Sequence, residues 1–155
     1  MQIMDFLNPK AISTDLKATD KKGIIKELLD LLINSGDISA SDKSAFLDVI
    51  IEREALGSTG IGLGVGIPHG KSQHVKNLVA SFGISRKGVN FDSLDGEPAH
   101  IFFLLLAPQD TAGPHLKALA RISRLLKEKY FRDALKKAAD PKEALKIIKE
   151  EDSKK

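Results

Sequence analysis

The sequence lacks cysteine altogether and has a single tyrosine among its 155 residues. Without cysteine, a disulfide framework, a thiolate nucleophile and a cysteine-ligated zinc site are excluded. A chain of this length can instead bury roughly 70% of its unfolded surface, so it needs neither a disulfide nor a metal to fold. We therefore expect one domain over residues 1–155, in keeping with a reducing, cytoplasmic environment.

Long apolar segments are also missing. The longest uninterrupted apolar run, Ile101 to Ala107, has seven residues, far fewer than the roughly 20 that a membrane helix requires. The first residues, Met1 to Asp5, show neither the basic nor the apolar region of a signal peptide. We expect a cytoplasmic protein that does not insert into a membrane.

Charge of one sign is not in large excess. The chain has 24 basic and 21 acidic side chains, a formal net charge of +3. Basic residues are mostly interleaved with acidic ones, as on solvated helix faces, and no basic stripe with aromatic side chains is present. Binding to nucleic acid is therefore not predicted.

Helical periodicity is visible in both halves of the chain. The predicted helices begin after Thr19 or Asp20, at Ser41, at Gly113-Pro114, at Tyr130 and at Asp140-Pro141. The first should end at Gly36, the second near Leu56-Gly57 and the fourth near Ala139. On the third helix the inward side chains are predicted to be Leu116, Leu119, Ile122 and Leu126.

Strand patterns occupy the middle of the chain. We predict an edge strand at Ala11 to Leu16, a strand at Leu78 to Ile84, and a strand buried on both faces at Ala99 to Ala107. Turns are predicted at Lys87-Gly88 and Asp95-Gly96. Strands between terminal helices favour an α/β domain in which helices cover a sheet.

Glycine occupies alternate positions from Gly60 to Gly66 and recurs at Gly70. The run fits either a tight strand or bulge beside a helix, or a backbone that a ligand approaches closely. A dinucleotide fingerprint is out of register, because its third glycine would fall on Val65 or Ile67. Gly70-Lys71-Ser72 resembles the end of a P-loop, but the leading glycine is again replaced by Val65. The sequence therefore disfavours nucleotide binding.

A histidine follows this run, with Pro68 restraining the backbone before it. His69 can be a base, a metal ligand or a nucleophile, or simply a surface histidine in a turn. His74 lies five residues on, which matches no usual zinc spacing, and His100 opens a buried strand. We assign no role to His74 or His100, and predict neither a metal site nor a cofactor.

Two blocks of sequence resemble a known family. The first runs from Arg53 to Gly62 and on from Gly66 to Lys71, and the second from Leu94 to Ile122. Together they resemble the type 2 enzyme IIA domains of the bacterial phosphotransferase system, the fructose/mannitol family, and most of all its nitrogen-regulatory branch. The resemblance implies a central mixed β-sheet flanked by helices on both faces. We expect a free-standing module, with neither a membrane domain nor an enzyme IIB domain attached.

The same resemblance assigns a role to five residues. It implies that His69 carries a phosphoryl group covalently, and that His115 and Arg53 stabilise it. Ser58 and Thr59 would donate hydroxyl or backbone hydrogen bonds to it. From the residues alone, His115 could equally face water, Arg53 could pair with a neighbouring glutamate, and Ser58 and Thr59 could cap a turn.

The resemblance also implies partners. The donor would be the phosphocarrier HPr or its nitrogen-branch homologue, and the acceptor an enzyme IIB or a regulatory target such as a kinase or an ion transporter. An alternative function is a regulatory binding module whose partner choice depends on the phosphorylation of His69, without onward transfer. One departure from the family is Gly66, where alanine is usual, and we expect it to loosen the turn slightly.

Overall fold

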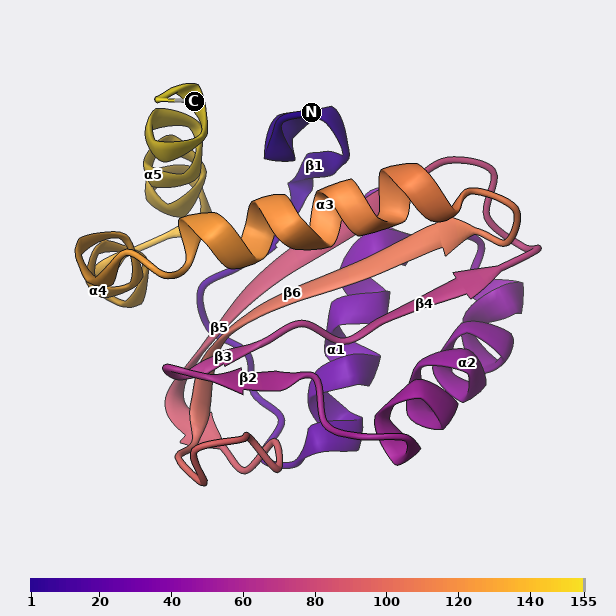
Figure 1. Cartoon of the computed structure of the whole chain (residues 1–155), viewed down its shortest axis with the longest axis horizontal. Coiled ribbons are helices and arrows are strands. Elements are labelled where there is room, and N and C mark those ends of the chain that lie inside the picture. Colours follow the sequence, from indigo (N-terminus) through magenta and orange to yellow (C-terminus); the bar gives the residue numbers. More distant parts are fainter. Residues whose placement is uncertain (155) are drawn as a thin grey trace.

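The computed structural model describes residues 1–154, which form a sheet with helices around it (Figure 1). The strands are β1 (Leu7–Ser13), β2 (Gly60–Gly62), β3 (Val65–Gly66), β4 (His69–Ser72), β5 (Val79–Val89) and β6 (Ala99–Pro108). The α-helices are α1 (Lys21–Asn34), α2 (Lys43–Ala55), α3 (Ala112–Leu125), α4 (Lys129–Lys137) and α5 (Pro141–Ser153). Two short 3-10 helices, η1 (Ile3–Asp5) and η2 (Ala40–Asp42), precede β1 and α2.

The sheet is mixed. Its strands follow the order β1-β5-β6-β3-β2, and β4 also pairs with β6 beyond the end of β3. β5 and β6 are antiparallel, whereas β3 and β4 both run parallel to β6. The predicted edge strand is confirmed as β1, although it begins at Leu7, four residues before the expected start at Ala11.

β6 is the centre of the molecule because both of its faces are buried. Ile101, Phe103 and Leu105 point into a core shared with α3, α4 and α5. Phe102, Leu104 and Leu106 point into a second core, shared with α1 and α2. The prediction of a strand buried on both faces is confirmed, and so is the mixed sheet flanked by helices on both faces (Figure 1).

The predicted helix starts are correct where an aspartate caps the helix. Asp20 accepts a hydrogen bond from the Gly23 amide, and Asp140 accepts one from the Glu143 amide. The prediction that Ser41 caps the second helix is wrong, because Ser41 lies inside η2 and its own amide donates to Ser39 Oγ. Consequently α2 begins only at Lys43.

The predicted inward face of α3 is confirmed at Ile122 and Leu126, which are buried, and at Leu119, which packs against the core, but it is wrong at Leu116. The helix begins at Ala112, before the Gly113-Pro114 pair, and Leu116 is 63% exposed. Its buried side includes His115, Ala118 and Ile122. Hydrophobicity alone favoured the leucine, but a small residue and a histidine are the ones that fit against the sheet.

The Lys87-Gly88 turn is a bulge instead of a turn. β5 continues through both residues to Val89, and its pairing with β6 is irregular between Ile84 and Val89. Gly88 has a φ of 82°, and a Cβ there would lie 2.7 Å from His100 Cε1. The glycine is therefore required by local packing, and it bends the strand without ending it.

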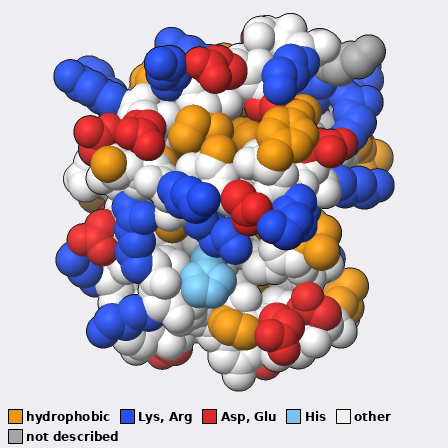
Figure 2. Space-filling view, turned by 90° about the vertical axis from the view of Figure 1, so that its left-hand side faces the viewer, with side chains coloured by type: hydrophobic (Ala, Val, Ile, Leu, Met, Phe, Trp, Pro, Cys, Tyr) orange, Lys and Arg blue, Asp and Glu red, His pale blue; other side chains and the backbone are white. Residues whose placement is uncertain are grey.

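The surface at the left-hand side of Figure 1 carries charges of both signs. Figure 2 shows lysine and arginine side chains interspersed with acidic ones across this face, with apolar groups between them. Among residues 1–154, none of the helices combines the length and the apolar character that crossing a membrane would require.

Gly66, which we expected to loosen the turn, has full surroundings. A Cβ at this position would lie 3.0 Å from Phe102 Cδ1 and 3.2 Å from Phe91 Cδ2. Both rings are fully buried and pack against each other with centroids 5.2 Å apart. The rings thus occupy the space that the methyl group of the usual alanine would need.

We predict that Gly66→Ala destabilises the protein by about 1–3 kcal/mol, since neither buried ring can move away without overpacking its neighbours. The matched control is Gly113→Ala in α3, where an added Cβ meets nothing within 4 Å and a stabilisation of about 0.5 kcal/mol is expected. Urea unfolding measures both. A Gly66→Ala variant as stable as the control would contradict the prediction.

Candidate functional site

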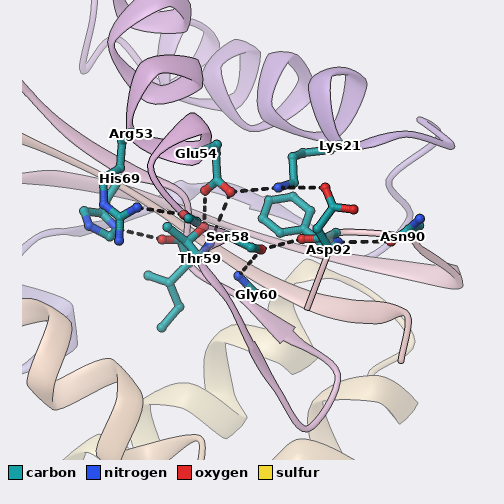
Figure 3. A network of polar contacts seen from close by, with 12 residues as sticks. Lys21, Arg53, Glu54, Ser58, Thr59, Gly60, His69, Asn90 and Asp92 are labelled. Carbon is teal, nitrogen blue, oxygen red and sulfur yellow. Dashed lines mark hydrogen bonds and ion pairs between the residues drawn. The ribbon is translucent and has the colours of Figure 1, made fainter. Parts of the chain in front are cut away.

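His69 is the first residue of β4, and the sheet register determines its position. It pairs with Leu105 of the central strand β6, and the Leu105 amide donates to the Pro68 carbonyl at 3.0 Å. Gly70 follows, and a Cβ there would lie 2.6 Å from Val49 Cγ1. The glycine therefore lets α2 pack directly on β4. Arg53 lies one turn after Val49 on the same side of α2, so it faces His69 (Figure 3).

The His69 ring is held by one hydrogen bond. Its Nδ1 lies 2.8 Å from the Ile67 carbonyl oxygen. A carbonyl oxygen can only accept, so Nδ1 must carry the hydrogen of the neutral imidazole. The lone pair is then on Nε2, which makes Nε2 the basic and nucleophilic nitrogen of this ring.

His115 lies directly beside His69. The two ring centroids are 5.3 Å apart, with an angle of 54° between the planes. His115 is only 5% exposed, and its Nδ1 is buried without a hydrogen-bond partner among the described residues. α3 and β4 are distant in sequence, so this pairing is a product of the tertiary fold. The alternative that His115 faces water is excluded.

Both histidines favour the neutral form. Burial lowers the pKa of His115 to about 4, and the neighbouring His69 and Lys71 act in the same direction. Burial also lowers the pKa of His69, and Arg53 adds to this effect, while the bond to Ile67 and the nearby Glu54 oppose it. The site therefore places two neutral imidazoles beside the cationic side chains of Arg53 and Lys71, an environment suited to an anionic group.

Arg53 is oriented by the end of its own helix. Its Nη1 donates to the Gly57 carbonyl at 2.8 Å, just beyond the last turn of α2. Within residues 1–154 no ion pair joins Arg53 to Glu52 or Glu54, because Glu54 pairs with Lys21 instead. The alternative of a neighbouring glutamate partner is therefore excluded, and the guanidinium retains donors for a ligand.

Ser58 and Thr59 have their hydroxyl groups engaged within the loop. Ser58 Oγ donates to the Phe91 carbonyl and accepts from the Gly60 amide. Thr59 donates both its amide and its hydroxyl to the Glu54 carboxylate. In the structure these two side chains stabilise the loop beneath His69, which is the alternative that the residues left open.

The remaining histidines lie apart from this pair. His74 Nδ1 is 3.6 Å from Asp42 Oδ1, and His100 Nδ1 is 3.0 Å from the Ser85 carbonyl oxygen. No cluster of three or more metal-binding side chains (His, Cys, Asp or Glu) occurs in the described part of the chain. What sequence reasoning missed is the pair Lys21 and Glu54, since Lys21 carries no motif and lies 33 positions from its partner.

We predict that His115 makes the folded state sensitive to acid. Its pKa of about 4 lies below the ordinary 6.5, so between these values the unfolded chain binds a proton that the folded chain does not. Stability therefore falls as the pH decreases through this window. Between about pH 7 and pH 4, the free energy of unfolding of the wild type should fall by on the order of 3 kcal/mol more than that of His115→Gln. Urea unfolding across pH measures this difference. An equal pH dependence of the unfolding free energy in the wild type and His115→Gln would refute the prediction, and so would the same reduction in the exposed control His74→Gln.

Solved structures share this architecture. The crystal structure of the nitrogen regulatory protein IIA-Ntr from Neisseria meningitidis superposes with a TM-score of 0.84 at 33% identity, covering 94% of this chain and 98% of that one. The complex of mannitol enzyme IIA with phosphorylated enzyme IIB from Escherichia coli contains the same fold, with a TM-score of 0.77 at 18% identity over 92% of this chain and 96% of that one.

Sequence comparison agrees with the fold. The nitrogen regulatory protein of Bradyrhizobium diazoefficiens is 37% identical over 140 residues, 90% of each chain. The fructose-specific EIIA component of Haloferax volcanii is 37% identical over 127 residues, 82% of this chain and 81% of that one. The chain spans 24% of the length of the Bacillus subtilis fructose-specific EIIABC component, with 36% identity. Residues 5–151 match the family model of the phosphoenolpyruvate-dependent sugar phosphotransferase system, EIIA 2, and the chain belongs to this family.

Proposed function

We propose that the protein is a phosphoryl carrier that forms a phosphohistidine on His69. One observation carries this proposal above the others. His69 has its Nδ1 hydrogen bonded to the Ile67 carbonyl and its ring 5.3 Å from that of the buried His115. The arrangement leaves Nε2 as the nucleophile and surrounds it with groups that favour an anion.

In the proposed transfer, Nε2 of His69 attacks the phosphorus of a phosphohistidine on the donor protein. The P–N bond of the donor breaks as the new P–Nε2 bond forms, and the electron pair returns to the donor imidazole. The hydrogen on Nδ1 stays in place, and the Ile67 carbonyl stabilises the positive charge that the His69 ring acquires. The reverse sequence passes the phosphoryl group to an acceptor.

Arg53 and His115 stabilise the phosphoryl oxygens in this proposal. Catalysis of phosphoryl transfer is mostly positioning and electrostatic stabilisation, and a guanidinium can bind two phosphoryl oxygens at once. His115 is neutral at physiological pH because of its low pKa, so it contributes as a hydrogen-bond donor and not as a second full charge. Ser58 and Thr59 contribute through the loop that their side chains stabilise.

The donor and the acceptor are proteins in this scheme. Leu56 and Leu116 are 86% and 63% exposed and belong to the segments that carry Arg53 and His115, so an apolar partner surface can dock beside the site. We propose HPr or its nitrogen-branch homologue as donor. For the acceptor, the mannitol enzyme IIA complex with phosphorylated enzyme IIB supports an enzyme IIB.

A regulatory output is the second candidate. Its support is the name of relatives at 33% and 37% identity, which are nitrogen regulatory proteins. A phosphoryl group adds roughly two negative charges to a site whose neighbouring segments carry the exposed Leu56 and Leu116, so binding of a kinase or an ion transporter at this face would change with the state of His69. Transfer and regulation use the same chemistry, and the acceptor distinguishes them.

We predict that His69→Ala abolishes phosphorylation. The wild type, incubated with phosphoenolpyruvate, enzyme I and HPr or its homologue, should gain one acid-labile phosphoryl group in intact-protein mass spectrometry. His74→Ala is the matched control, because His74 lies five residues on in the same segment and faces Asp42 instead of the site. Labelling of His69→Ala at the normal rate would refute the assignment.

We predict that Arg53→Lys slows phosphorylation by about 10- to 100-fold, since a point charge cannot replace two parallel hydrogen bonds to the phosphoryl oxygens. The stability of the variant should change by less than about 1 kcal/mol, because Arg53 donates a single bond, to the exposed end of α2. Quenched-flow labelling gives the rate. A rate equal to that of the wild type would show that Arg53 is not needed for transfer.

A further inference from the structure

Glu54 is a buried carboxylate next to Arg53 on α2, and neither oxygen is left without a partner. It is 8% exposed. Oε1 accepts from the Thr59 amide at 3.1 Å and from Lys21 Nζ at 2.9 Å, while Oε2 accepts from the Thr59 hydroxyl (Figure 3). A carboxylate so deeply buried persists only where charge and hydrogen bonds are both compensated.

Lys21 supplies the compensating charge from the start of α1. Its side chain is 19% exposed, and its Nζ also lies 3.3 Å from Asp92 and 4.8 Å above the Phe91 ring centroid. The residue therefore links α1, α2 and the loop after β5. None of these contacts touches His69. Apart from the electrostatic effect of Glu54 on the His69 pKa, the pair therefore acts on the site through other groups.

A continuous series of hydrogen bonds leads from Glu54 to His69. Glu54 holds Thr59 at its amide and hydroxyl. The Thr59 carbonyl accepts from the Ile67 amide at 3.0 Å, and the Ile67 carbonyl in turn accepts from His69 Nδ1 at 2.8 Å. Ile67 makes two of these links, one with its amide and one with its carbonyl. A displacement of Thr59 therefore shifts the Ile67 carbonyl, which sets the His69 tautomer.

We propose that Glu54, held by Lys21, is a positioning residue that keeps the hydrogen of His69 on Nδ1 and Nε2 free for attack. The inference rests on the proposed phosphoryl transfer, but its geometric part concerns the tautomer alone. The two acceptor oxygens of Glu54 position Thr59. The ion pair with Lys21 makes the burial of those oxygens possible.

Two double variants separate the hydrogen bonds from the charge. Lys21→Met/Glu54→Met removes the ion pair together with both acceptors for Thr59. Lys21→Met/Glu54→Gln removes the same charges, but its Oε1 can still accept from the Thr59 amide and its Nε2 can donate to the Thr59 hydroxyl. Neither leaves an unpaired buried charge, and apolar replacement of a buried ion pair is often tolerated. Asp92, which loses Lys21 in both, has a side chain that is 72% exposed.

The first readout is the tautomer of His69, from the ¹⁵N chemical shifts of its ring nitrogens near pH 8. The second is the rate of phosphorylation by the donor protein. We expect the Met pair to lose the predominance of the Nδ1–H form and to react about 10- to 100-fold more slowly, as expected for a misplaced reacting group. The Gln pair should stay within about twofold of the wild type in rate and keep its tautomer.

Equal tautomer populations in the two double variants would overturn the proposal, and so would a slow Met pair with an unchanged tautomer. If circular dichroism shows the Met pair to be unfolded, Thr59→Val and Thr59→Ser form the replacement pair. Val removes one of the two bonds to Glu54 and Ser keeps both, so only Val should shift the tautomer; no difference between them would again overturn the proposal. A wild type that accepts no phosphoryl group would refute the proposed function, while the tautomer measurement would still decide the role of Glu54.

Discussion

The burial of β6 on both faces is the constraint from which the rest of the architecture follows. A strand whose alternate side chains enter two separate cores needs helices on both sides of the sheet. The same strand pairs with β4 and so determines where His69 begins its strand, opposite Leu105. The chain then leaves the end of β6 into α3, which brings His115 to that position from the opposite side. The two histidines therefore meet because one strand organises both of their elements.

The electrostatics of the site depend on keeping its positive charge away from the imidazoles themselves. Burial holds both histidine pKa values below their ordinary range, so the rings stay neutral and the charge resides on Arg53 and Lys71. For the proposed transfer, the nucleophilic nitrogen must be unprotonated, whereas the phosphoryl group needs nearby cations. Separating the two requirements between different residues satisfies both at neutral pH. The buried Glu54 completes this arrangement, since its charge is already compensated by Lys21.

Sequence reasoning predicted the elements whose signals are local and failed where three-dimensional packing decided. Aspartate caps located α1 and α5, and an apolar run located β6, because each signal acts within a few residues. The exposure of Leu116 and the burial of His115 could not be predicted, since they depend on how α3 rotates against the sheet. Likewise, Lys21 shows no pattern that would link it to a glutamate in another helix. The resemblance named His69, Arg53 and His115, but it contained no statement about what orients them.

The glycine-rich run illustrates how such a pattern can indicate close packing instead of a phosphate loop. Gly70, Lys71 and Ser72 lie in β4, paired with β6, so their amides are not gathered at a helix N-terminus as a nucleotide site requires. The missing side chain at Gly70 admits Val49 of α2, and the one at Gly66 admits the Phe91 and Phe102 rings. Each glycine thus lets a neighbouring element approach the backbone near His69 closely. The glycines allow close approach, and the groups that approach are side chains of the protein itself. In the proposed function, the phosphate chemistry belongs to the histidine that this packing places, and not to the glycines themselves.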